Sequence, residues 1–516
     1  MRSMTRVVAL GMLLMVGWPA LVAGQPLTVS PLFADQAVLQ RDEPVVIFGS
    51  AAAGAEVRVS LGETPVNTQT DDAGRWRVEL PAMSADGATH TLTVSTDGQE
   101  LRAEGLVVGE VWLASGQSNM AWPISKTDGG EAFAQREHPM VRVFKVPRNP
   151  SAQVLAELRG RWSAPGAGDS AVALYFAEAL QQELGVPVGV IVSAVGGTPV
   201  ESWISQQALD DEPAFASTAQ AWAATTPDDP AVLRAYDKQW ADFSAALETW
   251  QQTPEDQRGD RPRAPATALF DPAHPRRPAV LYNGMIAPLE SVAVRGVLWY
   301  QGEGNSWRAR QYTALLNALF ADWRRQWDRP QLPFGVVQLA GWKTAERHRD
   351  TVAWLREAQA RVVRGDPHAG MVVSFDLSRD DGNIHPSHKR PIGQRLADWA
   401  LREVYHLDAA RGPRVAGVEV GEGFIEVVLE LDTPLVGDRW EGWELAGRDG
   451  RFVPAEAERV EADRLRVTSP EVDQPQAVRY AWSDWPRHGP VLDQAGYPLP
   501  PLRSDDQPDP TADGGM

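Results

Sequence analysis

The sequence predicts an α/β protein in which helices cover both faces of a parallel sheet and an all-β module lies on each side of it. Two observations predict this fold. Between residues 106 and 410, apolar strand-like runs alternate with long amphipathic segments, which is the pattern of consecutive βαβ units. In residues 25–105 and 411–503, short runs of alternating polarity are separated by turn residues, which is typical of antiparallel β modules.

The first 24 residues predict an export signal. Arg2 and Arg6 precede an apolar run from Val7 to Trp18, and small residues follow near Gly24. A core helix is the alternative, but the basic flank and the position in the chain favour export. We therefore expect a periplasmic or secreted protein. No later stretch of the sequence is long and apolar enough to cross a bilayer, so no membrane partner is expected.

The N-terminal β module is expected over residues 25–105 and to carry no chemistry. Its predicted strands are VVIFG, AEVRVSLG, RWRVEL and THTLTVSTDG. The second β module, over residues 411–503, is predicted from GFIEVVLELD, DRLRVTS and AVRYAW. The last segment, 504–516, has too few apolar groups to order itself.

The catalytic domain is expected in two parts, residues 106–204 and 279–410. Its strands are predicted at LVVGEVWLA, PVGVIVSA, VRGVLWY, FGVVQL and MVVSF, and its helices at 172–184, 310–327, 352–363 and from Lys389 onward. Functional sites of such sheets form at the carboxyl ends of the strands.

An inserted helical cap is expected over residues 205–278. Its apolar residues recur at spacings of three and four, which predicts a helical stripe. The stripe consists of Leu233, Tyr236, Trp240, Phe243, Leu247 and Trp250. Packing alone explains these residues, so they indicate no ligand.

Composition narrows the class of protein. The formal net charge of −19 disfavours a partner that is bound through its phosphates, so no nucleic acid is expected. The chain has no cysteine, which excludes disulfides, cysteine nucleophiles and thiolate metal sites. No histidine-rich metal motif is present in the sequence either, so no metal and no cofactor are expected.

Ser118 is the candidate nucleophile. The first predicted strand of the catalytic domain runs into GEVWLASGQSNM, which places Ser118 in a tight turn just past a strand end. A serine at this edge of a parallel sheet exposes its hydroxyl to a cleft, where neighbouring backbone N–H groups can face an oxyanion. The motif differs from the G-x-S-x-G nucleophile elbow.

His385 is the candidate general base. It lies in DDGNIHPSHK, after the last predicted strand and before an amphipathic helix. An imidazole can take a serine proton near neutral pH and return it to a leaving hydroxyl. The neighbouring His388 matches no motif and is expected to lie at the surface.

Several motifs together resemble the family of sialate O-acetylesterases and related SGNH carbohydrate acetylesterases. They are LFADQAVLQRDEPVVIFGSA, DDAGRWRVELPAM, GEVWLASGQSNM, GGTPVESWIS, LYNGMI, RGVLWYQGEGN, LREAQ, NIHPSHKRPIGQRLADWA and AVRYAW. Their order follows that of the family and covers nearly the whole chain after residue 24. The resemblance implies an SGNH, flavodoxin-like parallel sheet.

The resemblance also implies roles for individual residues. Ser118 matches the nucleophile, and Gly196 or Gly197 matches the glycine whose N–H contributes to the oxyanion hole. Gln301 and Asn305, in WYQGEGN, stand where such enzymes place a side-chain amide donor.

The acid of the triad is the point at which this sequence departs from the family pattern. The usual aspartate, three residues before the histidine, is replaced by Gly382. Asp381 is the favoured substitute, and Asp380 could also reach the imidazole. Glu303 is the rival, and a Ser–His dyad held by a backbone carbonyl remains open.

The predicted function is a serine esterase that removes O-acetyl groups from carbohydrates through an acetyl-enzyme intermediate. The expected substrate is an O-acetylated sialic acid, with acetylated xylan or xyloglucan as the alternative. A non-enzymatic alternative is a glycan-binding protein with an inactive SGNH core. The predicted partner is therefore an acetylated oligosaccharide or sialic acid, and the sequence predicts no particular oligomeric state.

Overall fold

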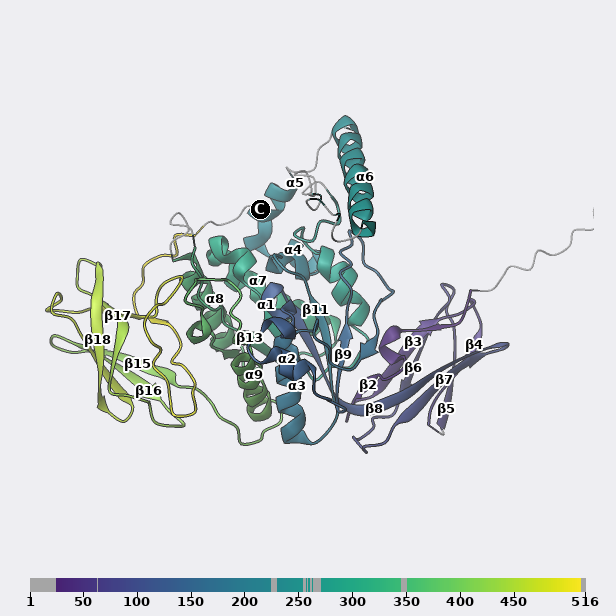
Figure 1. The fold of residues 1–516 in the computed structure, drawn as a ribbon, viewed down its shortest axis with the longest axis horizontal. Coiled ribbons are helices and arrows are strands. Elements are labelled where there is room, and N and C mark those ends of the chain that lie inside the picture. Colours follow the sequence, from purple (N-terminus) through teal and green to yellow (C-terminus); the bar gives the residue numbers. More distant parts are fainter. Residues whose placement is uncertain are drawn as a thin grey trace, which may run out of the picture.

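The computed structural model describes residues 25–62, 64–223, 230–253, 271–344 and 350–511, together with residues 257, 259 and 262. A mixed α/β body lies between two β modules, one at each end of the molecule (Figure 1). The expected export signal, residues 1–24, lies outside the described residues, as do residues 224–229 and most of residues 254–270 of the expected cap. No helix among the described residues is long and apolar enough to cross a membrane.

The N-terminal module contains two small groups of strands. β1 (Thr28–Val29), β3 (Val45–Ser50) and β6 (Arg75–Leu80) form one antiparallel sheet. β4 (Glu56–Leu61) pairs with β5 (Thr64–Gln69) and β7 (His90–Thr96). The described residues of β4 and β6 alternate between exposed and buried positions, so each of these two strands has one face on the module core.

β8 (Gln99–Gly116) joins this module to the central sheet as one continuous strand. Its first half pairs antiparallel with β7, and its second half pairs parallel with β11 and β12. β2 (Val38–Gln40) runs parallel to β8 at the point of change. From Leu106 to Gly116 every residue of the strand is buried, because this part of the strand is covered on both faces. The predicted boundary at residue 106 therefore falls inside a strand.

The central sheet has the order β10-β9-β11-β8-β12-β13-β14. Its members besides β8 are β9 (Val141–Lys145), β10 (Trp162–Ser163), β11 (Val188–Ala194), β12 (Gly296–Tyr300), β13 (Phe334–Val337) and β14 (Ala369–Val372). All neighbours pair in parallel except β10 with β9. The five predicted strands of this region are present, whereas β9 and β10 were not predicted.

Helices cover both faces of this sheet. They are α3 (Ala171–Leu184), α7 (Ala309–Gln326), α8 (Thr351–Gly365) and α9 (Arg390–Glu403). Trp112 of β8 contacts Phe176 of α3 and Trp399 of α9, whereas Trp299 of β12 contacts Trp323 of α7. Since Trp299 pairs with Ser115, three residues after Trp112, the two tryptophans point to opposite faces. The pair α3 and α9 therefore covers one face, and α7 with its neighbour α8 covers the other.

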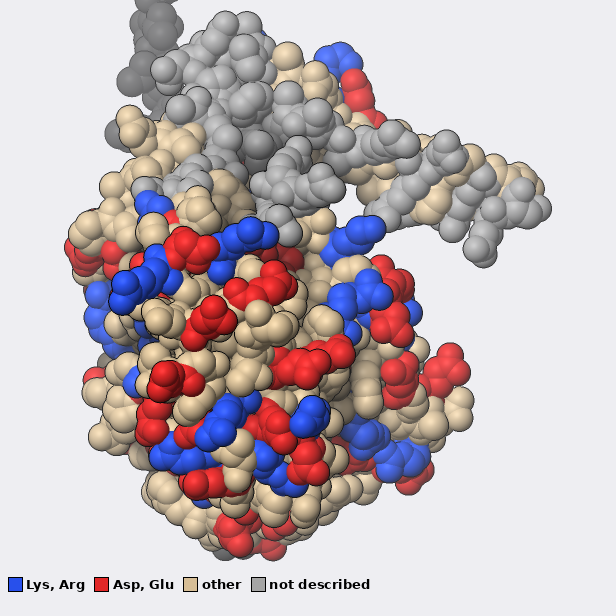
Figure 2. Space-filling model, turned by 90° about the vertical axis from the view of Figure 1, so that its left-hand side faces the viewer, with Lys and Arg blue, Asp and Glu red and all other residues tan. Residues whose placement is uncertain are grey.

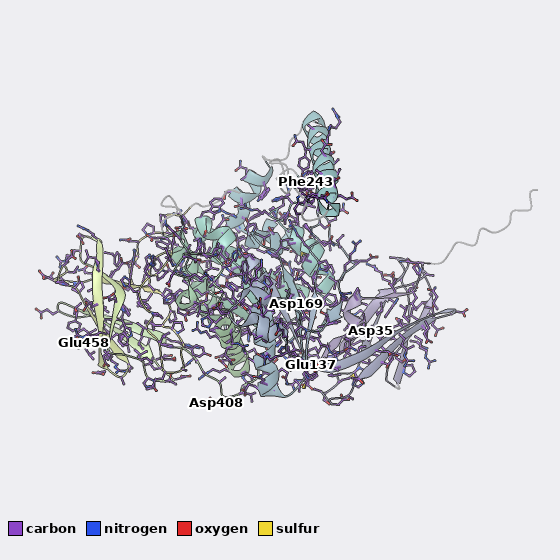
Figure 3. The ribbon with its side chains drawn as sticks, viewed as in Figure 1. Asp35, Glu137, Asp169, Phe243, Asp408 and Glu458 are labelled. Atoms are coloured by element: carbon purple, nitrogen blue, oxygen red, sulfur yellow. The ribbon has the colours of Figure 1, made fainter. Side chains whose placement is uncertain are left out.

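The segment between β11 and β12 contains α4 (Gln206–Asp210), α5 (Ala216–Ala223) and α6 (Pro230–Gln252). α6 projects from the α/β body, and Phe243 lies on it (Figures 1 and 3). Along this helix, Tyr236, Trp240 and Phe243 meet edge to face. The helix predicted from the aromatic stripe is thus present, and a role as a cap stays a prediction.

The C-terminal module is one antiparallel sheet with the order β15-β16-β19-β18-β17-β20-β21. Its strands are β15 (Arg414–Val420), β16 (Ile425–Glu430), β17 (Arg439–Ala446), β18 (Phe452–Glu461), β19 (Arg464–Thr468), β20 (Ala477–Tyr480) and β21 (Leu502–Arg503). Its buried core also takes in Val373 and Phe375, which follow β14. After β21, Asp505 pairs with Arg479 at 2.7 Å. Acidic and basic side chains are intermixed over the described surface at this end of the molecule (Figure 2).

Candidate active site

Ser118 lies at the carboxyl end of β8, where it begins the short helix α1 (Ser118–Ala121). The turn before it depends on Gly116, which has φ of 135°. A methyl group at this position would lie 2.2 Å from the backbone oxygen of Tyr300 on β12. Only glycine lets the two strands approach this closely and still turns the chain sharply into α1. The predicted position of Ser118, just past a strand end, is therefore what the structure shows.

The structure brings His385 to Ser118, although 267 residues separate them in the sequence. The Nε2 atom of the imidazole lies 2.8 Å from the Ser118 Oγ. The imidazole also stacks on the indole of Trp122, with ring centroids 4.2 Å apart and planes 15° from parallel. The backbone N–H of His385 donates to Asn383 Oδ1 at 2.9 Å. The ring is therefore held in position by contacts on its face and at its backbone.

The electrostatic surroundings keep this imidazole neutral. Partial burial lowers the pKa of His385 below its usual value, and the positive charges of Lys389 and Lys126 lower it further. A neutral imidazole at physiological pH has an Nε2 lone pair that can accept the Ser118 proton. The geometry and the charge state are thus both those required of a general base.

Asp381 lies on the same loop as His385, but its carboxylate faces another group. It accepts hydrogen bonds from Arg379 at 3.1 Å and from the Asn383 backbone N–H at 3.0 Å. The Arg379 side chain holds the pKa of this exposed carboxyl below its usual range. Among the described residues, neither Asp381 nor Asp380 forms a hydrogen bond with the imidazole.

Gly196 lies directly against Ser118. A methyl group at Gly196 would be 3.2 Å from the Ser118 Cβ. The preceding residue, Val195, is tied to the same turn because its N–H donates to the Gly116 carbonyl at 3.0 Å. Gly197 has φ of 73°, in the left-handed region that glycine adopts readily. Of the predicted glycine pair, Gly196 therefore forms the wall beside Ser118, and Gly197 forms the turn that follows it.

Gln301 and Asn305 are buried behind this wall, with their amides engaged by the protein. Gln301 Nε2 donates to the Thr198 carbonyl at 3.1 Å and to Asn305 Oδ1 at 2.8 Å. Asn305 Nδ2 donates to Glu201 at 2.9 Å, and its Oδ1 accepts from the Val200 N–H at 2.8 Å. Both side chains thus brace the loop that follows Gly197, and neither is seen contacting Ser118.

Two residues that the sequence interpretation did not single out, Asn119 and Lys389, link the two halves of the site. Asn119 Nδ2 donates to Glu303 Oε1 at 2.5 Å and to the Ile384 carbonyl at 3.0 Å. The Lys389 ammonium donates to Asn119 Oδ1 at 2.5 Å. Asn119 directly follows Ser118, and Ile384 directly precedes His385. The hydrogen bond between Asn119 and Ile384 therefore connects the two segments that carry Ser118 and His385. Both residues lie within the quoted motifs GEVWLASGQSNM and NIHPSHKRPIGQRLADWA, and this position was the signal in the sequence that could have found them.

The charges in this link are buried. Burial lowers the pKa of Lys389 to about 7, although the negative charge of Glu303 acts in the opposite direction. Burial raises the pKa of Glu303, and its hydrogen bond from Asn119 opposes this rise. Glu303, the rival candidate for the acid, thus meets Asn119 rather than the imidazole.

A serine–imidazole pair at the carboxyl edge of a parallel sheet, beside a glycine wall, is the arrangement of α/β ester hydrolases. Residues 108–226 and 270–402 match the family model described as carbohydrate esterase, sialic acid-specific acetylesterase. The chain belongs to this carbohydrate esterase family and is a carboxylic ester hydrolase.

Individual relatives agree with this assignment. The chain is 29% identical to a sialate O-acetylesterase of Rattus norvegicus, over 93% of this chain and 94% of that protein. It is 26% identical to a sialate O-acetylesterase of Homo sapiens, with 92% of each covered. Among solved structures, a carbohydrate acetylesterase from Xanthomonas citri is 31% identical, with a TM-score of 0.77 over 93% of this chain and all of that one. These relatives support removal of O-acetyl groups from carbohydrates.

Proposed function

We propose that this protein is a serine esterase of the SGNH type that removes O-acetyl groups from carbohydrates, with Ser118 as nucleophile and His385 as general base. The observation that carries the proposal is the 2.8 Å contact between Ser118 Oγ and His385 Nε2. This is the distance needed for proton transfer within a hydrogen bond. The pair lies at the sheet edge where α/β proteins bind their ligands.

The reaction follows from these roles in two halves. His385 Nε2 takes the hydroxyl proton as Ser118 Oγ attacks the acetyl carbonyl carbon, which gives a tetrahedral oxyanion. The carbon–oxygen bond to the sugar then breaks, and the imidazolium returns its proton to the departing sugar oxygen. In the second half His385 deprotonates a water molecule, which attacks the acetyl-enzyme. Acetate leaves, and the proton returns to Ser118 Oγ.

The oxyanion would be stabilised by backbone N–H groups. Ser118 is the first residue of α1, so its N–H has no partner within the helix. Gly196 lies against Ser118, and its N–H or that of Gly197 supplies the second donor. Each donor contributes roughly 3 kcal/mol to lowering the barrier. Gln301 and Asn305 would not bond the oxyanion themselves. They hold the loop that follows these glycines in place, through Thr198 and Val200.

Among the described residues, no carboxylate is hydrogen-bonded to Nδ1 of the imidazole. Trp122 fixes the plane of the ring, and Asn383 fixes its backbone. The Asn119 side chain sets the distance between the two loops, since it bonds Ile384 and is itself held by Glu303 and Lys389. We thus propose a Ser–His dyad, with Asn119, Glu303 and Lys389 as positioning residues.

The proposed substrate is an O-acetylated sialic acid, as in the sialate O-acetylesterases to which the chain is similar. The exposed Lys126 ammonium supports an anionic sugar, because it lies over the Trp122 ring and close enough to affect the imidazole. Acetylated xylan or xyloglucan is the alternative. A neutral hemicellulose carries no negative charge with which the Lys126 ammonium could pair.

Acetate release tests the proposal. Wild-type protein should release acetate from O-acetylated sialic acid or from an acetylated hemicellulose oligosaccharide, and Ser118→Ala should lose this activity by about 10⁴-fold or more. Ser244→Ala, at an exposed position of α6, is a control that keeps the proposed nucleophile. Full activity in Ser118→Ala would exclude this nucleophile, and no release from any acetylated glycan would favour the glycan-binding alternative.

A further inference from the structure

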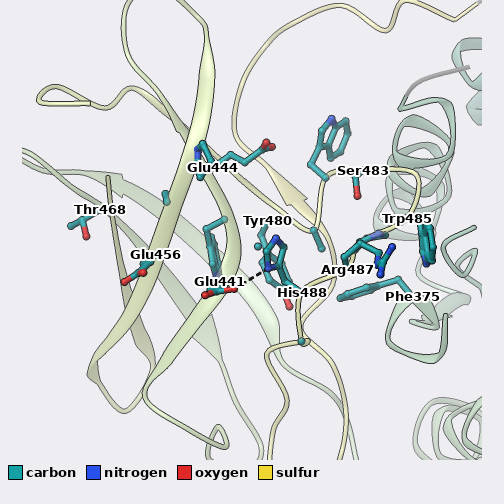
Figure 4. A pocket seen from close by; sticks show the side chains of 18 of the residues that line it. Phe375, Glu441, Glu444, Glu456, Thr468, Tyr480, Ser483, Trp485, Arg487 and His488 are labelled. Carbon is teal, nitrogen blue, oxygen red and sulfur yellow. Dashed lines mark hydrogen bonds and ion pairs between the residues drawn. The ribbon is translucent and has the colours of Figure 1, made fainter. Parts of the chain in front are cut away.

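The C-terminal module contains a cleft of about 680 Å³ that is separate from Ser118 and His385. One side of the cleft is formed by β17, β18 and β19, and the other by residues 481–489. Figure 4 shows Glu456 and Thr468 on the strand side, Trp485 and Arg487 on the opposite side, and His488 between them. A cleft of this size can hold several sugar rings or a small ligand.

Aromatic rings form the base and one wall of the cleft. Trp443 and Tyr480 are buried beneath it, with ring centroids 4.5 Å apart. Trp485 is only half-buried, and the Arg487 guanidinium lies 4.2 Å from its centroid. A partly exposed indole presents a flat apolar surface that matches the C–H face of a pyranose ring.

Hydrogen-bonding groups stand around these rings. Glu441 and the His488 Nδ1 lie 3.1 Å apart, which fixes the imidazole at the mouth of the cleft. Glu456 and Thr468 are exposed and directly opposite each other in the β18–β19 register. The Glu456 carboxylate can accept a hydrogen bond from a sugar hydroxyl, and the Thr468 hydroxyl can donate or accept one. Side chains on adjacent strands can thus bond neighbouring sugar hydroxyls.

The charge of the lining favours a neutral ligand. Four glutamates line the cleft, at positions 441, 444, 456 and 471, against one arginine and one histidine. An anionic sugar would be repelled by this excess of negative charge. A neutral glycan would bring hydroxyl donors to the same carboxylates.

The cleft is connected to the loop that carries the catalytic histidine. The Trp485 indole N–H donates to the Arg379 carbonyl at 3.1 Å. A methyl group at Gly382 would lie 3.2 Å from the same indole ring. Residues 379–383 lead directly to His385, so one edge of the Trp485 indole contacts the catalytic loop while the side chain also lines the cleft.

We propose that the cleft between β17–β19 and residues 481–489 is a second glycan-binding site, which holds a neutral segment of the substrate polymer. Trp485 stacks on one sugar ring, and Glu441, Glu456 and Thr468 bond hydroxyls of other rings of the same glycan. The site keeps a decorated glycan next to the catalytic loop between successive deacetylations. From the proposed function the proposal takes only that the substrate is a glycan.

Direct binding measurements test this site. The probes are the neutral oligosaccharides xylohexaose and cellohexaose, with 3′-sialyllactose as the anionic comparison, titrated by calorimetry into the full chain carrying Ser118→Ala. At least one neutral probe should bind, and more tightly than sialyllactose. In this background Trp485→Ala and Glu456→Ala should each weaken its binding about tenfold or more.

Two further variants separate binding from structural support. Glu458→Ala changes an exposed glutamate of the same strand that lies outside the cleft and should leave the dissociation constant unchanged. Trp485→Phe keeps a ring but removes the donor to Arg379, so it should retain most of the binding that Trp485→Ala loses. Melting temperatures of all variants establish that each is folded.

Three outcomes would overturn the proposal. They are no binding of either neutral probe, binding that Glu456→Ala leaves intact, and tighter binding of sialyllactose than of both neutral probes. The result is independent of catalysis, since every binding experiment uses the Ser118→Ala background. Loss of oligosaccharide binding would leave the esterase proposal standing, and absence of acetate release by wild-type protein would leave the cleft proposal standing.

Discussion

At the scale of single residues, the environment of His385 decides its charge. Burial and two lysines act in the same direction, so its pKa lies below the usual value of 6.5. The imidazole is therefore neutral over a wider pH range than a solvent-exposed histidine. The proposed general base acts in this neutral form, so the activity should persist under mildly acidic conditions.

The pH profile should report this environment. The proposed mechanism requires neutral His385, so kcat/KM should fall only as pH drops below 6.5, through the lowered pKa. Lys126→Met removes one of the nearby positive charges and should move the acidic limb of the profile toward higher pH. Lys238→Met, on α6, is the control and should not move it. A limb that stays in place in Lys126→Met would show that this charge does not act on the base.

Asp381 should prove dispensable for catalysis. Its carboxylate bonds Arg379 and the Asn383 N–H, so Asp381→Ala should lower kcat by less than about tenfold. A true triad aspartate would cost about 10⁴-fold when its charge is removed. Steady-state acetate release distinguishes the two cases. Asp380→Ala is the matched control, and a loss near the larger value in Asp381→Ala would restore the triad interpretation.

At the scale of elements, the site is built where β8 meets α1. The strand is buried on both faces up to Gly116, and the turn into α1 presents Ser118 at the sheet edge. β8, β11 and β12 run in parallel, so the loops that follow β11 and β12 begin at the same edge of the sheet as α1. Each loop then adds one component: the glycine wall after β11, and the Gln301–Asn305 brace after β12.

The tight turn predicts a stability cost for any side chain at Gly116. Gly116→Ala places a methyl group against the Tyr300 carbonyl at an unfavourable φ, and should lower the free energy of unfolding by about 2–4 kcal/mol. Gly185→Ala is the control, because Gly185 has a positive φ but open space around it. Gly185→Ala should lower the free energy of unfolding by only about 1 kcal/mol. Denaturant unfolding measures both, and equal losses would show that the Tyr300 contact is unimportant.

At the scale of the whole molecule, the N-terminal module and the α/β body share a strand. β8 belongs to both, and β2 extends the contact between them. The Trp162 indole donates to the Leu32 carbonyl, and Arg142 donates to the carbonyls of Gln36 and Gly105. These bonds cross from one part to the other, so the two parts should fold as one cooperative unit.

Removal of residues 25–98 should therefore unfold the α/β body. The deletion takes away β2 and the partner of the first half of β8, which leaves a long unpaired strand edge. We expect an insoluble product without esterase activity. In the intact chain, near-UV circular dichroism and activity should be lost in a single thermal transition. A soluble, active deletion variant would contradict this dependence.

The sequence by itself determined the α/β alternation, the five main strands, the aromatic helix and the two motifs that contain Ser118 and His385. These features are encoded in short-range periodicity and in adjacent residues, so they can be recognised without coordinates. Only the tertiary structure decided that Ser118 and His385 meet, that Asp381 faces Arg379, and that Gln301 and Asn305 brace a loop. It also brought Lys389 to Asn119. The physical reason is that these contacts join segments far apart in the chain or depend on side-chain direction, and both are set when the parallel strands align their carboxyl ends.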